Sequence, residues 1–214
     1  STLVLIFGGA LLILLFEYNN VNTIANYNIF DKIQISIFQS ITTRTAGFAT
    51  IPQENLTDQS VITCLILMFI GGSPVGTAGG IKTITAVSLL AIAIASIRNK
   101  KEVVLFNRNL SSEITRKAVA VTAMSFMIVM ISTILLSLTI DRSIVDILYE
   151  TVSATATVGL SRNLTPFLNS IGKIIVIITM YLGRVGPISL AIAFKSKKES
   201  SNIILNPTEE VSIG

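Results

Sequence analysis

Long apolar runs separated by short polar segments dominate this chain. A bilayer core of about 30 Å takes roughly 20 helical residues at about 1.5 Å each, so such runs predict membrane-crossing helices. One crossing is interrupted by a glycine-rich stretch at 71–80. The pattern predicts an all-α membrane protein whose apolar runs cover 2–16, 61–70, 81–97, 118–138 and 171–194.

Two shorter amphipathic segments, 31–41 and 141–154, lie between the apolar runs. The first is too short to cross a bilayer core. We interpret both as re-entrant half helices that begin near Asp31 and Asp141, because a carboxylate stabilises a helix N-terminus. For the first segment and the polar stretch after it, an outer loop that never enters the membrane is the alternative.

A short polar stretch with a glycine follows each half helix. Residues 154–161 read Ala-Thr-Ala-Thr-Val-Gly-Leu-Ser. A backbone that turns its carbonyl oxygens toward a desolvated ion needs a glycine with short neighbours. We therefore predict a cation filter formed by Thr43, Arg44, Thr45, Ala46 and Gly47 together with Thr155, Ala156, Thr157, Val158 and Gly159. The expected potassium ligands are the carbonyls of Thr45, Gly47, Thr157 and Gly159.

The two filter segments belong to an internal repeat. The shift along the chain that carries Gly47 onto Gly159 also carries residues 68–71, Met-Phe-Ile-Gly, onto 180–183, Met-Tyr-Leu-Gly. Because the predicted filter and the helix after it repeat together, the chain is expected to contain the same structural unit twice. The sequence thus predicts two helix–half helix–helix units, at 1–112 and 113–194, followed by a cytosolic tail at 195–214.

The interruption at 71–80 holds five glycines and one proline, so it cannot stay regularly helical. Broken helices expose backbone groups along ion paths, which predicts a flexible gate below the filter. A packing kink at a helix crossing is the alternative. A phosphate loop is disfavoured because Ile81 separates Gly80 from Lys82. The predicted gate residues are Gly71, Gly72, Ser73, Pro74, Gly76, Gly79 and Gly80.

Composition and charge narrow the class and orient the chain. Hydrophobic residues make up 51% and charged residues 13%, which is typical of an integral membrane protein. The absence of histidine, with Cys64 as the one cysteine, excludes disulfides and histidine-based catalysis. Basic residues gather at 98–117 and 195–198, which predicts that both segments lie on the inner side of the membrane. This clustering explains the net charge of +4 better than binding to nucleic acid does.

Several other charged residues are expected to lie in or near the pore. An arginine at the depth of Arg184 costs roughly 2.5 kcal/mol or more, so it forms either a structural ion pair or a barrier to cations in the inner pore. Lys82 reaches for the inner surface or lines the inner vestibule. On the outer side we expect a cation-attracting mouth with Glu17, Asp31, Glu54, Asp58, Asp141, Asp146 and Glu150.

Four motifs together resemble the Trk/Ktr/HKT superfamily of potassium transporters, most of all the C-terminal half of a KtrB-type membrane subunit. They are residues 42–48, 68–74, 79–83 and 183–187. The resemblance implies four repeats around one pore, with 71–80 as the intramembrane gating loop and Arg184 below the filter. It further implies a homodimer in membrane lipid on a cytosolic ring of nucleotide-binding, KtrA-like regulatory subunits.

The function we expect is potassium uptake across the bacterial plasma membrane, downhill or sodium-assisted, with no enzymatic activity and no bound cofactor. Two filter strands do not enclose an ion, so we also expect a missing N-terminal half, in line with the apolar run that starts at once after Ser1. The alternatives are a secondary transporter of a small solute and an incomplete, non-conducting half of a transporter. An enzyme using Ser73 or Lys82 is disfavoured.

Overall fold

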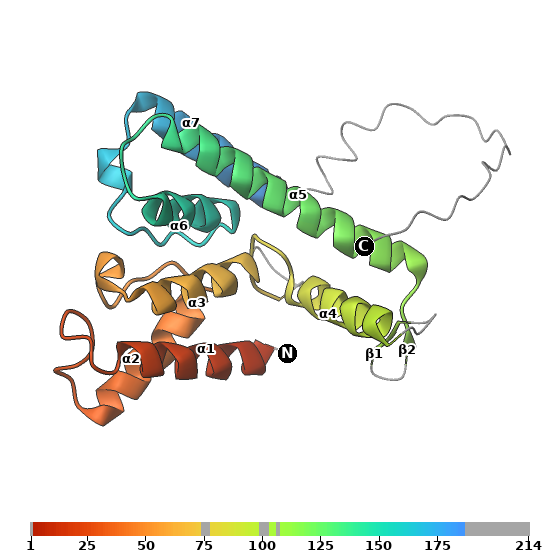
Figure 1. Cartoon of the computed structure of the whole chain (residues 1–214), viewed down its shortest axis with the longest axis horizontal. Coiled ribbons are helices and arrows are strands. Elements are labelled where there is room, and N and C mark those ends of the chain that lie inside the picture. The colour runs from red at the N-terminus through yellow and green to blue at the C-terminus, as the bar shows by residue number, and fades with distance from the viewer. Residues whose placement is uncertain (1, 74–77, 99–102, 106–107, 187–214) are drawn as a thin grey trace, which may run out of the picture.

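The structure is a computed structural model that describes residues 2–73, 78–98, 103–105 and 108–186. The chain folds mainly into helices, as predicted, and these form two neighbouring groups joined by a separate helix (Figure 1). The first group contains α1 (Thr2–Glu17), α2 (Ile29–Thr42) and α3 (Asp58–Phe69). The second contains α5 (Ser112–Ser137), α6 (Ile144–Thr155) and α7 (Ser170–Val185), and α4 (Thr83–Ile97) joins the two.

The two groups have the same order of elements. In each, a long helix is followed by a short one, a turn with a glycine, a one-turn 3-10 helix and a third helix. The 3-10 helices are η1 (Gln53–Asn55) and η2 (Thr165–Phe167). The shift that carries Gly47 onto Gly159 also carries η1 onto η2 and the first residue of α3 onto that of α7. The sequence repeat is therefore also a repeat of helix positions.

Side-chain caps account for several helix starts. Thr57 accepts a hydrogen bond from the Ser60 amide at α3, and Asn169 accepts one from the Gly172 amide at α7. The second short helix begins at Ile144 rather than near Asp141, because Ser143 caps it by accepting from the Val145 amide. The predicted segment 141–154 therefore began three residues too early, and Asp146 is the acidic residue in the first turn of α6.

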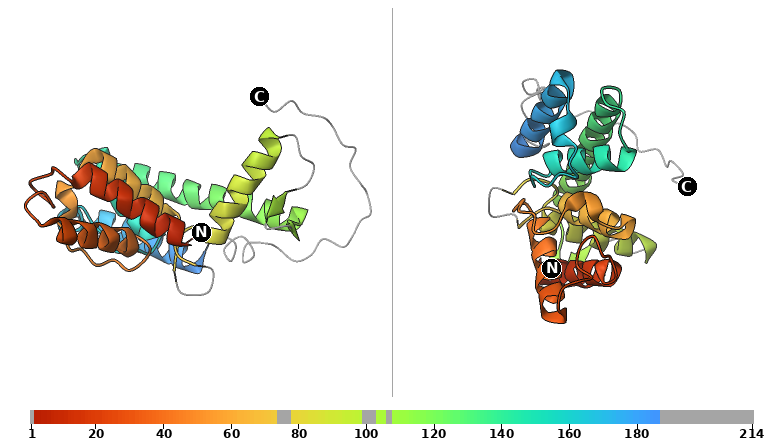
Figure 2. Two further views of the ribbon diagram at one scale, coloured as in Figure 1. Left: turned by 90° about the horizontal axis from the view of Figure 1, so that it is seen from below. Right: turned by 90° about the vertical axis from the view of Figure 1, so that its left-hand side faces the viewer.

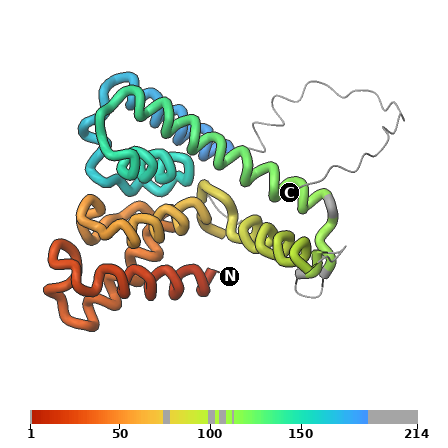
Figure 3. Tube along the Cα trace, viewed as in Figure 1, coloured from red at the N-terminus to blue at the C-terminus, as the bar shows by residue number. Residues whose placement is uncertain are grey.

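The stretch between α4 and α5 contains a small hairpin that the all-α prediction missed. Strands β1 (Val104–Leu105) and β2 (Arg108–Asn109) pair antiparallel. Figure 2 shows α4 and the adjacent end of α5 extending away from the rest of the helices on the same side, with the hairpin beside them. The chain passes from the first group to the second through this segment (Figure 3).

Much of the helix surface is apolar. Large side chains such as Phe7, Ile66 and Phe126 are more than half exposed. Among the described helices, one is long and apolar enough by itself to cross a membrane, at Glu113–Ser137 within α5. Helices α1, α3 and α4 are also apolar, but each has fewer than 18 residues.

The main apolar core lies where the two groups meet. Cys64 and Met68 of α3 and Tyr149 and Val152 of α6 are buried in one cluster, which also includes Val158 from the second glycine turn. Packing α3 against α6 in this way brings the segments that follow α2 and α6 together. The core thus positions the two predicted filter segments relative to each other.

Candidate cation filter and the loop beside it

The two glycine segments lie side by side, although they come from opposite halves of the chain. A Cβ atom built on Gly47 would collide with the carbonyl oxygen of Val158. A Cβ built on Gly159 would lie 3.9 Å from the Gly47 Cα. A side chain on Gly47 therefore has no room next to the second segment.

Both segments have the same unusual backbone conformation. The glycines have positive φ values, 79° at Gly47 and 95° at Gly159. Two threonines are also left-handed, with φ 71° at Thr45 and 56° at Thr157. A left-handed conformation costs a residue with a Cβ roughly 1–2 kcal/mol, and such strain gathers at functional sites. The repeat therefore has matching strained positions in both of its copies.

Hydroxyl groups of the short helices hold the segments in place. Thr42 at the end of α2 bonds the main chain of Phe48 twice, accepting from its nitrogen at 2.7 Å and donating to its oxygen at 2.6 Å. Ser153 of α6 accepts a hydrogen bond from the Gly159 nitrogen at 3.1 Å. Neither residue was among the predicted site residues. In both cases the hydroxyl lies six residues before its partner, which is a spacing that sequence reasoning could have tested.

Other predicted filter residues point their side chains away from the neighbouring segment. Thr43 donates to the Ser40 carbonyl and Thr155 to the Thr151 carbonyl, each within the preceding helix. Arg44 donates to the carbonyl oxygens of Thr2 at 3.3 Å and Gly71 at 3.1 Å. Ala46, Ala156 and Val158 have no polar side-chain atoms, so the main chain is the principal source of polar groups here.

The predicted gating loop contacts both segments. Gly71, Gly72, Ser73, Gly79 and Gly80 are described, whereas Pro74 and Gly76 lie outside the described residues. The Gly79 nitrogen donates to the Thr157 hydroxyl at 3.0 Å, and Gly71 accepts from Arg44. A Cβ on Gly71 would collide with the Gly79 carbonyl oxygen, so the two ends of the loop touch each other. Each end of the loop is thereby bonded to a different filter segment.

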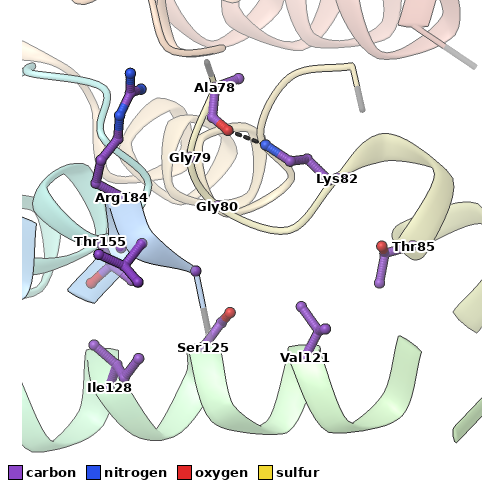
Figure 4. A pocket seen from close by; sticks show the side chains of 13 residues that line it. Ala78, Gly79, Gly80, Lys82, Thr85, Val121, Ser125, Ile128, Thr155 and Arg184 are labelled. Atoms are coloured by element: carbon purple, nitrogen blue, oxygen red, sulfur yellow. Dashed lines mark hydrogen bonds between the residues drawn. The ribbon is translucent and has the colours of Figure 1, made fainter. Parts of the chain in front are cut away.

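A cavity of about 270 Å³ lies next to this loop, between it, α5 and α7 (Figure 4). Lys82 and Arg184 both line it, together with Ser125 of α5. The Lys82 ammonium group donates to the Ala78 carbonyl oxygen across the loop. Gly183 fits α7 against the base of the second segment, because a Cβ there would collide with the Thr155 carbonyl oxygen.

Two acidic residues expected at an outer mouth are buried, and a third, partly exposed one forms an ion pair. Glu17 is fully buried and accepts hydrogen bonds from Asn20, Thr23 and Thr57. Glu150 is 6% exposed and accepts from the hydroxyls of Ser161 and Thr165, and Asp146 pairs with Arg162 at 2.7 Å. The outer-side mouth stays a prediction, in which Glu17 and Glu150 would act as buried, hydrogen-bonded carboxylates and Asp146 as one member of an ion pair.

The family model of the TrkH cation transport proteins matches residues 2–205. The chain belongs to this family. It is 40% identical over 203 residues to the Ktr system potassium uptake protein B of Bacillus subtilis, covering 95% of this chain and 45% of that protein. It is 33% identical over 214 residues to the protein of the same name from Vibrio alginolyticus, covering 100% of this chain and 47% of that protein.

Two further comparisons extend the picture. The chain is 32% identical over 219 residues to the potassium/sodium uptake protein NtpJ of Enterococcus hirae, covering 100% of this chain and 48% of that protein. The crystal structure of the potassium transporter TrkH from Vibrio parahaemolyticus has a similar fold, with a TM-score of 0.73 and 17% identity over 91% of this chain and 42% of that one. The chain thus spans about half the length of these relatives, and the transporter family sets the enzyme alternative aside.

Proposed function

We propose that this chain supplies two strands of a potassium-selective filter in an uptake protein of the bacterial plasma membrane. Main-chain oxygens of Thr45, Gly47, Thr157 and Gly159 take the place of the ion's water shell. The observation that carries the proposal is the contact between Gly47 and Gly159, each in a left-handed backbone that its repeat partner shares. A carbonyl-lined path needs such a backbone, whereas a small-solute pocket needs converging polar side chains.

The short helices fit the role of re-entrant half helices. Helix α2 ends at Thr42 and α6 at Thr155, directly before the filter strands. The C-terminal end of a helix carries a partial negative charge, which favours a cation nearby. In this proposal residues 1–112 and 113–194 are two of the helix–half helix–helix units around the pore, and residues 195–214 form a cytosolic tail.

The loop at 71–80 serves as the gate in this proposal. Its described ends bond to the two filter strands, and it lies next to the cavity lined by Lys82 and Arg184. Positive charges beside a potassium path raise the energy of a cation there, and in this proposal Arg184 contributes to a barrier in the inner pore. Displacing the loop would open the path past these charges.

The complete transporter needs partners beyond this chain. Two strands do not surround an ion, so an upstream half supplies the remaining strands in our proposal. The assembly dimerises in membrane lipid, and a cytosolic ring of nucleotide-binding, KtrA-like subunits docks on the inner side. Residues 98–117 and the tail at 195–214, which lies outside the described residues, are the proposed docking surfaces. Sodium assistance is included because one relative is named a potassium/sodium uptake protein.

Rubidium uptake tests the proposal. A host that lacks its own potassium uptake systems is given a protein that joins this chain to an upstream half, and radioactive rubidium entry is measured. We expect saturable uptake and growth at low potassium. Uptake of a small organic solute without rubidium entry would point to a secondary transporter, and an absence of any flux would point to a non-conducting half.

A further inference from the structure

One buried amide side chain bonds to both short helices. Gln53, the first residue of η1, is 2% exposed. Its Oε1 accepts a hydrogen bond from Gln39 Nε2 on α2 at 2.6 Å and another from the Tyr149 hydroxyl on α6 at 2.9 Å. Its Nε2 donates to the Ile51 carbonyl oxygen at 2.8 Å and to Gln39 Oε1 at 3.3 Å. Both polar atoms of this side chain are therefore fully used.

The main chain of Gln53 extends the same connection to the second filter segment. Arg162 lies three residues after Gly159. Its Nη1 donates to the Gln53 carbonyl oxygen at 3.0 Å, while its Nε pairs with Asp146 of α6 at 2.7 Å. Gln53 thus links α2, α6 and the end of the second filter segment through direct hydrogen bonds.

We infer that Gln53 is a positioning residue that sets the spacing between the two filter strands, and thereby the preference for potassium over sodium. The inference rests on the proposed function as a potassium filter. Gln39 and Tyr149 lie on the two helices that end directly at the strands. A shift of one short helix against the other moves its strand by a similar amount, because the strand follows without a flexible linker.

The hydrogen bonds that join Gln53 to Gln39 and Tyr149 are strong because all three side chains are buried. Gln39 and Tyr149 are both fully buried, so water cannot replace a lost hydrogen bond. Hydrogen bonds in such low-dielectric surroundings are stronger than those in water, and a half-satisfied network is costly. Without the Gln53 amide the two short helices lose their shared side-chain partner, and their separation is then set by apolar packing and by the Arg162 bond to the Gln53 main chain.

The repeat indicates that this role is specific to Gln53. The equivalent residue in the second group is Thr165, the first residue of η2, whose hydroxyl bonds to Glu150 of its own short helix at 2.5 Å. Gln53 has a longer side chain and reaches across to the other group. Gln53 contacts both groups but lies outside both proposed filter strands. It can therefore be substituted without changing the sequence of either strand.

The test compares two variants of similar volume, one that removes all four hydrogen bonds of the Gln53 amide and one that removes only the bond to Tyr149. Gln53→Met removes the amide, and Tyr149→Phe removes one oxygen atom from the other end of the contact. Gln59→Met on the exposed side of α3 and Tyr27→Phe in the loop between α1 and α2 are the matched controls, because both side chains are exposed. Rubidium uptake into cells is measured at increasing sodium, with the variants placed in a protein that joins this chain to an upstream half.

We expect Gln53→Met and Tyr149→Phe to lower the rubidium-over-sodium preference on the order of fivefold, with the controls unchanged. Because they disrupt one shared contact, the double variant should be no worse than Gln53→Met. A purely structural role would reduce protein abundance and maximal rate while leaving the ion preference intact, and this result would overturn the inference. If Gln53→Met does not accumulate, Tyr149→Phe decides. Absence of uptake in the unmodified protein would instead refute the proposed function.

Discussion

Single residues account for the close meeting of the two proposed filter strands, residues 43–47 and 155–159. Gly47 has no room for a side chain against Val158, and Thr45 and Thr157 hold a conformation that few residues adopt. These strained positions persist because the hydroxyls of Thr42 and Ser153 fix the turns around them. The geometry of the proposed site thus depends on small side chains and on main-chain atoms.

Gly47→Ala tests this close approach. The added methyl group would collide with the Val158 carbonyl oxygen and occupy a left-handed position, at a cost of roughly 1–2 kcal/mol for the backbone alone. We expect the preference for rubidium over sodium to fall about tenfold, measured as competition in cellular uptake. Gly8→Ala is the control, since nothing lies within 4 Å of its added Cβ. An unchanged preference in Gly47→Ala would contradict the proposed filter.

Glu17 provides a stability test at the same scale. Its buried carboxylate joins the end of α1 to the start of α3 through the nitrogen and hydroxyl of Thr57. Hydrogen bonds to a charged group contribute about 1.5–3 kcal/mol each, so Glu17→Ala should lower the melting temperature in detergent by several degrees. The exposed Glu54→Ala should melt like the unmodified protein. Equal melting of both variants would show that this carboxylate is not needed for stability.

At the scale of elements, the described ends of the loop at 71–80 and the two short helices contact the same two proposed filter segments. The short helices hold the strands through Thr42 and Ser153, and the ends of the loop hold them through Arg44 and Thr157. Movement of the loop therefore breaks contacts with the strands while the short helices keep them in place. This arrangement suits a gate that opens without dismantling the filter.

Deleting residues 72–79 tests the gate. We expect a higher maximal rate of rubidium uptake, because the occluding segment is removed while the hydroxyl supports of the strands remain. The same deletion in a Gly47→Ala background should raise flux without restoring ion preference. Unchanged flux on deletion would remove the gate assignment and favour a plain packing kink.

Elements were predicted more reliably than their contacts. The order of helices and the paired glycines followed from apolar runs and from a repeat that carries Gly47 onto Gly159, because both signals can be read along the chain. The predicted segment began three residues before α6, because the helix starts after its Ser143 cap. The bond between Gln53 and Tyr149 joins distant parts of the chain and had no local signature. The burial of Glu17 likewise depends on neighbours that only the folded chain supplies.

At the scale of the whole molecule, the chain contributes two proposed filter strands and has a largely apolar surface on its helices. It spans about half the length of its relatives in the cation transport family. Two strands leave the remaining sides of an ion without ligands, so this chain by itself should not conduct. Liposomes containing only this chain should stay impermeable to rubidium, and adding the upstream half should restore flux. Conduction by this chain alone would indicate that two copies surround one pore.

The most direct measurement is the position of thallium, a heavy substitute for potassium, in crystals of the transport-competent protein. Anomalous scattering locates the ion independently of any functional assay. The account predicts a peak within coordination distance of the carbonyl oxygens of Thr45, Gly47, Thr157 and Gly159, and its weakening when sodium replaces potassium in the crystal. Ordered thallium elsewhere along the pore, with none at these four oxygens, would contradict the account.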